Sequence, residues 1–145
     1  MTEPRTNPPS AGTAPILSGR TIVVIDDDAS LLMLMRNYLR RAGADVHVAE
    51  NGRDAWALLE QLSASPTPPH AVLCDLRMEN GSGMELYRRV CEETPALKAR
   101  LIFSSGDITS DDVRSFVEQC DVRVLEKPYP LADLRTLLAE LPPVC

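Results

Sequence analysis

The stretch that decides the fold is "AVLCDLRMENGSG", residues 71–83, in which four apolar residues run straight into an aspartate and a glycine-bearing polar loop. A short apolar run of this kind predicts a strand buried on both faces. Burying an ionised carboxylate is costly unless it is paired or bound to a metal. Asp75 is therefore either a structural capping residue or a functional carboxylate at the entrance of a binding or reaction site.

The amino-acid composition limits the possible classes of protein before any motif is considered. The 145 residues suit one domain, and a hydrophobic fraction of 44% with only 4% aromatic residues predicts an aliphatic core. The net charge of -6 argues against direct nucleic-acid binding and suits a protein that binds a cation. No apolar run reaches the roughly 18 residues of a membrane span, and no signal peptide is recognisable. The four cysteines lack metal-ligand spacing. We therefore expect a cytoplasmic protein with reduced thiols and no membrane partner.

The chain is expected to divide into three parts. Residues 1–19 are rich in Pro, Ser and Thr and are predicted to form a disordered tail or linker. Residues 20–141 are predicted to form the folded domain, and residues 142–145 a C-terminal tail.

Within residues 20–141 the hydrophobic pattern predicts five strands that alternate with five helices. Strands separated by helices run parallel through right-handed crossovers, so the fold class is α/β, with one doubly wound sheet. Ligands of such folds lie outside the carboxyl ends of the strands. The strands are expected at 21–26, 45–49, 70–75, 99–105 and 122–126, and the helices at 29–43, 51–64, 82–93, 109–120 and 130–141.

Polar residues gather at the expected carboxyl ends of these strands. Carboxylates brought together there repel one another and call for a cation, and oxygen ligands suit Mg²⁺. A hydroxyl and an ammonium group on the other side would suit a phosphoryl group. The residues concerned are Asp26, Asp27, Asp28, Asp75, Ser104, Ser105, Glu126 and Lys127.

Four stretches, "VVIDDDAS", "LCDLRMENGSGMEL", "LIFSSGD" and "VLEKPY", together resemble the receiver domain of two-component response regulators. The resemblance covers Arg20 to Leu141. It implies a flavodoxin-like sheet with strand order 2-1-3-4-5. It also implies a phosphorelay function, in which a sensor histidine kinase or a histidine phosphotransfer domain gives a phosphoryl group to the domain, which then switches conformation. Such a domain is a signalling module and not an enzyme in the ordinary sense.

The resemblance also implies a role for each site residue. Asp75 would be the phosphoacceptor, and Ser105 and Lys127 would contact phosphoryl oxygens. Mg²⁺ would be held by Asp26, Asp27, Asp75 and the backbone carbonyl of Arg77. Lys127–Pro128 resembles the cis peptide of the family.

The sequence departs from the family pattern at two positions. Val124 stands where the family usually has an aromatic residue that takes part in the switch, and Glu79 stands where a proline is usual. Arg77 and Asp107 flank the acceptor and Ser105. We hypothesise that these two residues pair across the pocket mouth and slow the approach of water; the alternative is two independent, solvated charges.

The first helix is expected to bury a stripe of Leu31, Leu34, Met35 and Tyr38 against the sheet. Leu32 and Met33 fall off that stripe, so they are either shielded or form an exposed apolar patch that docks a kinase or phosphotransfer helix.

Other functions remain open at this point. "IVVIDDDAS" also fits the start of haloacid-dehalogenase-like phosphatases, with Asp26 as nucleophile and Asp28 as acid/base, although this leaves Asp75 unexplained. A pseudo-receiver would keep the fold as an interaction module without phosphorylation. A stand-alone regulator and a segment of a hybrid kinase are both compatible with the sequence. Homodimerisation through the face formed by residues 109–141 is also left open.

Overall fold

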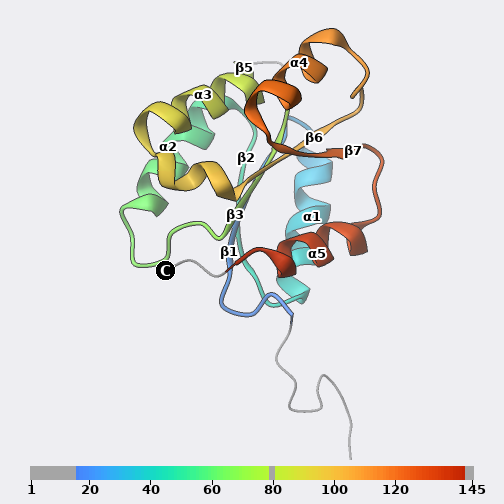
Figure 1. Cartoon of the computed structure of the whole chain (residues 1–145). Helices are drawn as coiled ribbons and strands as arrows, with labels where there is room; N and C mark the ends of the chain where they lie inside the picture. Colours follow the sequence, from blue (N-terminus) through green and yellow to red (C-terminus); the bar gives the residue numbers. More distant parts are fainter. Residues whose placement is uncertain (1–15, 79–80, 143–145) are drawn as a thin grey trace, which may run out of the picture.

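A five-stranded parallel sheet with helices on both faces makes up the body of the computed structural model, which describes residues 16–78 and 81–142 (Figure 1). The strand order is β2-β1-β3-β6-β7. Counted without a small separate hairpin, this is the predicted order 2-1-3-4-5, which is thereby confirmed. The strands are β1 (Thr21–Ile25), β2 (Asp45–Ala49), β3 (Ala71–Asp75), β6 (Leu101–Ser105) and β7 (Arg123–Glu126).

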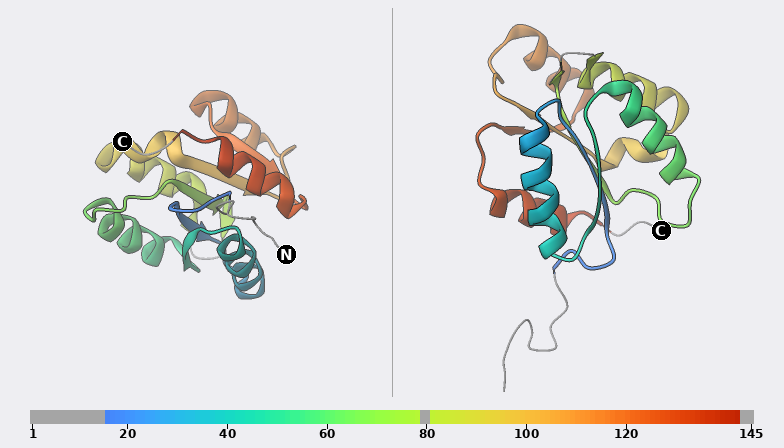
Figure 2. Two further views of the ribbon diagram at one scale, coloured as in Figure 1. Left: turned by 90° about the horizontal axis from the view of Figure 1, so that it is seen from below. Right: turned by 180° about the vertical axis from the view of Figure 1, so that it is seen from behind.

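Five α-helices cover the two faces of this sheet (Figure 2). Two of them, α1 (Ala29–Arg41) and α5 (Leu131–Glu140), pack on one face. The other three, α2 (Gly52–Ser63), α3 (Gly83–Glu93) and α4 (Asp111–Cys120), pack on the opposite face. None of the helices in the described ranges is long and apolar enough to cross a bilayer.

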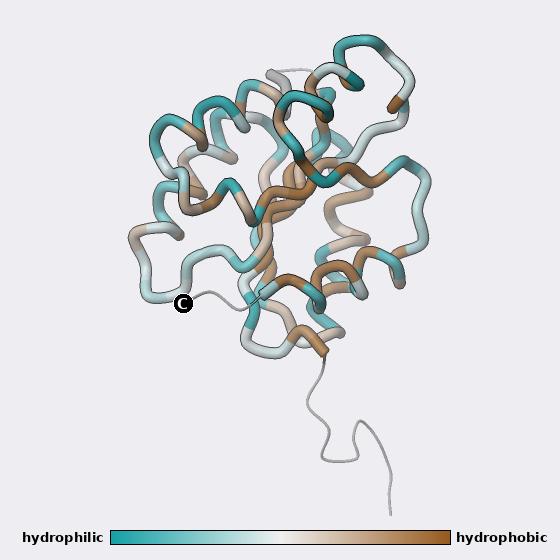
Figure 3. Tube along the Cα trace, in the orientation of Figure 1, coloured by the Kyte–Doolittle hydropathy of each residue, from teal (hydrophilic) through white to brown (hydrophobic). Residues whose placement is uncertain are grey.

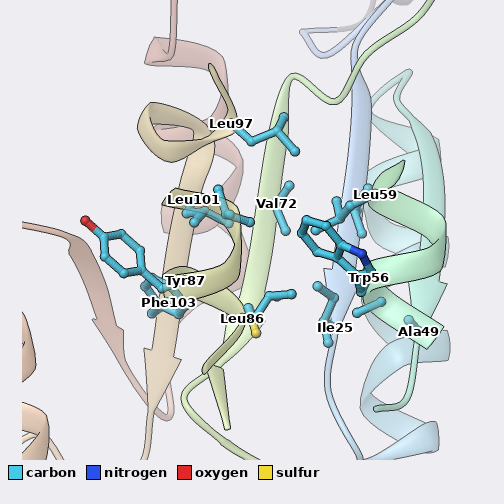
Figure 4. Packing of buried hydrophobic residues seen from close by; sticks show 14 of the residues in the cluster. Ile25, Ala49, Trp56, Leu59, Val72, Leu86, Tyr87, Leu97, Leu101 and Phe103 are labelled. Atoms are coloured by element: carbon cyan, nitrogen blue, oxygen red, sulfur yellow. The ribbon is translucent and has the colours of Figure 1, made fainter. Parts of the chain in front are cut away.

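Side chains of each strand alternate between two cores, as the pleat of a doubly covered sheet requires. In β1, Ile22 and Val24 point toward α1 and α5, whereas Val23 and Ile25 point toward α2 and α3. Apolar residues therefore concentrate along the strands, and polar residues on the outer helix surfaces (Figure 3). Figure 4 shows Trp56 reaching from α2 toward the sheet in the larger core.

Three aromatic rings hold α3 and α4 to the sheet. Tyr87 of α3, Phe103 of β6 and Phe116 of α4 make edge-to-face contacts, with ring centroids 5.3 to 6.1 Å apart. Such contacts stabilise beyond the area that they bury. Because Phe116 lies in the second turn of α4, this contact fixes the middle of that helix rather than its beginning.

The first helix is rotated relative to its predicted orientation. Its buried residues are Leu32, Met35 and Leu39, whereas Leu34 is 55% exposed. Leu34 was predicted to face the sheet and Leu32 to lie off the buried stripe, so both of these predictions are wrong. All five residues from 31 to 35 are apolar, and the pattern alone therefore cannot choose the face. Of the two residues for which shielding or an exposed patch was left open, Leu32 is shielded and Met33 is 58% exposed.

Two short elements were not predicted. A two-stranded antiparallel hairpin of β4 (Arg77–Met78) and β5 (Gly81–Ser82) follows β3, and a 3₁₀ helix, η1 (Pro95–Arg100), precedes β6. The hairpin lies directly after Asp75 and brings the chain back to the start of α3. Glu79, where the family usually has proline, lies outside the described residues.

The chain joins the domain before the predicted boundary at residue 20. Leu17 is fully buried in the core beside α1 and α5, and its N–H donates to the Ala42 carbonyl at 2.8 Å. Residues 16–19 are therefore not part of a free tail as predicted, because a buried leucine anchors them. The rest of the predicted N-terminal tail, residues 1–15, lies outside the described residues, as do residues 143–145 of the predicted C-terminal tail.

Candidate functional site

The predicted site residues meet at the carboxyl edge of the sheet. Asp26 follows β1, Asp75 ends β3, Ser105 ends β6 and Lys127 follows β7. The parallel register sets Asp75 beside Ser104 and Ser105 beside Glu126. Strands far apart in sequence thus deliver these groups to one place, as the topology of the fold requires.

Lys127 bridges two buried carboxylates at the centre of this site. Its Nζ donates to Oδ2 of Asp26 at 2.8 Å and to Oδ2 of Asp75 at 3.2 Å. Asp26 is only 4% exposed and Asp75 only 9% exposed, so the ammonium group supplies the compensation that buried carboxylates need. The other carboxylate oxygen of each accepts a backbone N–H, from Asp28 to Asp26 and from Arg77 to Asp75.

The ionisation of this cluster is perturbed. Burial raises the pKa of the Asp75 carboxyl, and the neighbouring Asp26 charge adds to this, while the Arg77 N–H and Lys127 oppose it. Burial of the ammonium lowers the pKa of Lys127, but the hydrogen bond and charge of Asp26, with those of Asp75, more than offset this, and the pKa is raised. Perturbed groups of this kind are typical of functional sites.

The acidic residues form a donor set that fits a hard divalent cation. Carboxylate oxygens of Asp26, Asp27 and Asp75 lie within 4.8 Å of one another, and Asp27 is exposed to solvent. All three donors are oxygens, which is the set that Mg²⁺ prefers. The arrangement therefore fits the predicted metal. The ligand role predicted for the Arg77 carbonyl stays a prediction.

Asp28, the third aspartate of the run, has a different function from its neighbours. Its Oδ1 accepts the N–H groups of Ser30 and Leu31 at 3.0 and 3.2 Å, which makes it the N-cap of α1. Asp28 therefore has a structural role at the start of α1, which accounts for the third aspartate of the run without an acid/base function.

Ser105 is buried, at 2% exposed, and its Oγ accepts the backbone N–H of Asp107 at 3.1 Å. This hydrogen bond ties the hydroxyl to the loop between β6 and α4. The predicted contact of Ser105 with a phosphoryl oxygen is not tested by this geometry.

Arg77 pairs with a different partner from the one predicted. Its Nη2 donates to Oδ1 and Oδ2 of Asp112 at 2.6 and 2.7 Å, and to Ser110 Oγ at 3.2 Å. Asp107 instead accepts from the backbone and hydroxyl of Thr109, which lowers the pKa of the Asp107 carboxyl. The predicted Arg77–Asp107 pair is therefore wrong, because Asp107 caps its own turn while the first turn of α4 binds Arg77.

Two surfaces flank the site. On one side, Leu31, Leu34, Lys127, Pro128, Tyr129 and Leu131 line an apolar groove of about 270 Å³. On the other, Val124 is half-buried and helps to line a hollow of about 410 Å³ between α4 and β7, together with Ile108 and Val117. The Lys127–Pro128 peptide bond is cis, as the resemblance implied.

Sequence reasoning missed two features of this site. One is the Asp112–Ser110 pair that binds Arg77, and the other is the close approach of Gly83 to Asp75. A Cβ at Gly83 would lie 2.7 Å from the Asp75 carbonyl oxygen. The repeated glycines at 81 and 83 were the one available signal for this approach.

Comparison with known proteins agrees with the observed fold. The family model described as "Response regulator receiver domain" matches residues 22–139. The response regulator receiver protein CpdR of Brucella abortus is 30% identical over 119 residues, which are 79% of this chain and 90% of CpdR. A response regulator receiver protein of Pseudomonas putida superposes with a TM-score of 0.70 at 28% identity, covering 82% of this chain and 94% of that one.

The chain belongs to the response regulator receiver family and is a signalling domain of the two-component type. The fold likeness extends to the chemotaxis protein CheY4 of Vibrio cholerae, with a TM-score of 0.71 at 20% identity, covering 84% of this chain and 98% of CheY4. The comparisons give no support to the phosphatase alternative.

Several relatives are much longer proteins. The chain covers 19% of the transcription factor SKN7 of Saccharomyces cerevisiae, at 27% identity over 87% of this chain. It covers 10% of histidine kinase 3 of Arabidopsis thaliana, at 32% identity over 71% of this chain.

Proposed function

We propose that Asp75 is the phosphoacceptor of this receiver domain and that Lys127 and Ser105 bind the phosphoryl group. The observation that carries the proposal is the Asp75 carboxylate, buried at the end of β3 and hydrogen bonded to Lys127 Nζ at 3.2 Å. Because the Lys127 ammonium group already contacts the Asp75 carboxylate, it can form an ion pair with a phosphoryl oxygen once Asp75 is phosphorylated. The family supplies the reaction class, and the geometry supports these residues for it.

The transfer begins with a phosphohistidine of the donor protein. One Asp75 carboxylate oxygen attacks phosphorus, the P–N bond breaks as the P–O bond forms, and the imidazole leaves and takes up a proton. In phosphoryl transfer the protein contributes mainly position and electrostatic stabilisation. Lys127 offsets charge on the phosphoryl oxygens, and the Ser105 hydroxyl, which accepts from the Asp107 N–H, has its own proton free to donate to one of them.

Asp26, Asp27 and Asp75, with the Arg77 backbone carbonyl, would hold Mg²⁺. When bound, the ion would neutralise charge on the carboxylates and the incoming phosphoryl group. The close spacing of the three carboxylates supports this assignment.

The partner would be a sensor histidine kinase or a histidine phosphotransfer domain. The apolar groove between α1 and Tyr129 opens beside Lys127, and Met33 and Leu34 stand exposed on the adjacent helix surface. An amphipathic helix of the donor could place an apolar side chain there and its histidine toward Asp75. Cys74, Cys91 and Cys120 are free thiols, which is consistent with action in a reducing cytoplasm.

Intact mass after incubation with Mg²⁺ and a small-molecule phosphodonor tests the proposal. We expect the wild-type chain to gain one phosphoryl group and Asp75→Asn to gain none. A folded wild-type chain that gains nothing would favour a pseudo-receiver. A gain that survives Asp75→Asn but not Asp26→Asn would revive the phosphatase.

A further inference from the structure

The first turn of α4 holds the guanidinium group of Arg77. A single nitrogen, Nη2, contacts both carboxylate oxygens of Asp112 and the Ser110 hydroxyl at 2.6 to 3.2 Å. The Arg77 and Asp112 side chains are 54% and 55% exposed. An ion pair at this exposure contributes little stability and can exchange partners readily.

The backbone of Arg77 is attached to the phosphoacceptor. Its N–H donates to Asp75 Oδ1 at 3.2 Å, and β4, in which it lies, begins two residues after Asp75. Arg77 therefore stands between the carboxylate that would be phosphorylated and the helix that binds its side chain. Rotation of the side chain alone would change its partner, because the backbone is already in place.

We propose that Arg77 is a second phosphoryl-binding cation beside Lys127, that Asp112 and Ser110 hold it aside in the unphosphorylated chain, and that phosphorylation of Asp75 draws it away from α4. This inference rests on the proposed function. A phosphoryl group brings about -1.5 to -2 charge units and three acceptor oxygens. Arginine binds such a group in a fork geometry, so the phosphoryl group competes well against a single solvated carboxylate.

The first turn of α4 is placed to respond to the loss of Arg77. Val113 is the one fully buried residue of this helix, and the aromatic contacts of Phe116 hold the turn that follows. The hollow beside Val124 leaves room on the β7 side, where a larger side chain would pack. Release of Asp112 therefore loosens the beginning of α4 while its middle stays attached. In this chain the Arg77–Asp112 pair carries the signal that an aromatic at position 124 would otherwise carry.

Coupling between the two sites has to act in both directions. If phosphorylation weakens the Arg77–Asp112 pair, then removing Asp112 favours the phosphorylated state, because Arg77 no longer has a competing partner. Asp112 is thus a positioning residue. Without it, the freed guanidinium group stays on the phosphoryl oxygens and hinders the approach of water, so the aspartyl phosphate decays more slowly.

The test compares Asp112→Asn with Asp111→Asn in the full chain. Asp111 lies in the same first turn of α4 and carries the same charge, and within the described ranges the Arg77 ion pair is formed with Asp112. Intact mass gives the phosphoryl content and its decay, and amide hydrogen exchange of residues 111–116 reports on the first turn of α4.

We expect phosphorylation to increase exchange in this segment of the wild-type chain and of Asp111→Asn. In unphosphorylated Asp112→Asn, exchange should already be at the higher level, and its phosphoryl group should decay about two- to five-fold more slowly. Adding Arg77→Ala to Asp112→Asn should remove the slower decay, since the gain depends on the freed guanidinium group.

A chain that is phosphorylated without any change in α4 exchange overturns the inference, as does equal decay in the two asparagine variants. Both results leave the proposed function intact. A wild-type chain that gains no phosphoryl group overturns the proposed function and this inference together.

Discussion

Gly83 occupies a position that no other residue can fill without a shift of the backbone at Asp75 and Leu76. A Cβ there would lie 2.7 Å from the Asp75 carbonyl oxygen and 3.0 Å from the Leu76 Cα, both of them backbone atoms. The Gly83 N–H also donates to the Leu76 carbonyl at 3.0 Å. The start of α3 is thereby packed directly against the residue that carries the proposed chemistry.

We expect Gly83→Ala to lower the free energy of unfolding by about 1–3 kcal/mol, because overpacking against backbone cannot be relieved by a rotamer change. It should also slow phosphorylation, since Asp75 must move with its carbonyl. Urea denaturation and intact mass measure the two effects. Gly106→Ala is the matched control, because a Cβ at Gly106 has nothing within 4 Å. Equal losses in the two variants would contradict the close-approach argument.

Lys127 is shared by two buried carboxylates, and its removal leaves both without this cation. We expect Lys127→Met to lower the free energy of unfolding by about 1–3 kcal/mol in the absence of divalent cations. Mg²⁺ should restore part of this loss if the acidic cluster binds it.

Lys98→Met provides the control, because Lys98 is the one other lysine of the chain and is exposed on η1. Denaturant titrations with Mg²⁺ and with a chelator give the comparison. A Lys127→Met chain that is insensitive to Mg²⁺ would argue against the metal assignment.

At the scale of the element, α1 depends on Asp28 at its N-terminus. Replacing an N-cap by alanine costs about 0.5–2 kcal/mol, whereas serine keeps an acceptor for the same N–H groups. We therefore expect Asp28→Ala to be destabilised in thermal or urea unfolding and Asp28→Ser to be close to wild type. Phosphoryl gain at Asp75 should survive in Asp28→Ser, whereas a phosphatase that used Asp28 as its acid/base would lose activity.

The exposed face of α1 is where we expect the phosphodonor to dock. Leu34 is 55% exposed and lines the groove beside Lys127, while Ile16 is 53% exposed and lies near the opposite edge of the sheet. We expect Leu34→Glu to slow transfer from a donor protein about ten-fold or more, since a charge in an apolar contact costs over 1.4 kcal/mol. Its reaction with a small phosphodonor should be unchanged.

Ile16→Glu introduces the same charge at the same exposure and should leave both rates as they are. Single-turnover transfer from a phosphorylated partner measures the first rate. Slowing by both variants would point to a general charge effect instead of docking.

The elements that could be predicted from sequence are long enough to show a recognisable hydrophobic pattern. Continuous apolar runs locate β1, β3 and β6, and the rule for parallel strands then brings Asp26, Asp75 and Lys127 to one edge. The β4–β5 hairpin has two residues in each strand, so it carries no period to read. In α1 the apolar run from 31 to 35 fits more than one face, and only packing against the sheet decides between them.

Contacts between side chains distant in sequence were beyond prediction for a different reason. Arg77 and Asp112 are 35 residues apart. Asp107 lies in the loop before α4 and Asp112 in the first turn of α4, so sequence alone offers both as partners of Arg77. A local contact decides which aspartate pairs with Arg77, because the Thr109 hydroxyl donates to the Asp107 carboxylate. No pattern in a single sequence encodes that competition.

At the scale of the whole molecule, His70 ties three segments together at the amino edge of the sheet. It is 4% exposed, its N–H donates to the Thr21 carbonyl, and its Nε2 lies 3.3 Å from the Leu138 carbonyl of α5. Arg20 donates to the same carbonyl at 2.7 Å. Burial lowers the pKa of His70, and the positive charges of Arg20 and Arg100 lower it further, although the Leu138 carbonyl opposes them.

The sign of the resulting pH dependence follows from linkage. The unfolded chain takes up a proton on this histidine near its usual pKa of about 6.5, while the folded chain resists it. This contribution to stability is therefore complete above that pH and is lost as the pH falls below it. We expect His70→Gln to reduce the difference in unfolding free energy between pH 7.5 and pH 5.5.

His47→Gln is the control for the His70 prediction, because His47 lies half-buried on β2 beside Asp45, away from this cluster. Urea denaturation at the two pH values gives the comparison. An equal reduction in both variants would contradict the assignment to His70.

The buried Leu17 fixes where the described chain enters the domain, and Arg100, which donates to the Pro142 carbonyl, fixes where it leaves. Both points lie at the amino edge of the sheet, at the opposite pole from Asp75 (Figure 1). A fluorescent protein or an affinity handle attached through these two points would therefore join the domain at the edge opposite Asp75. Other modules can thus be connected at the amino edge of the sheet while the carboxyl edge, where we propose that the phosphodonor binds, stays accessible.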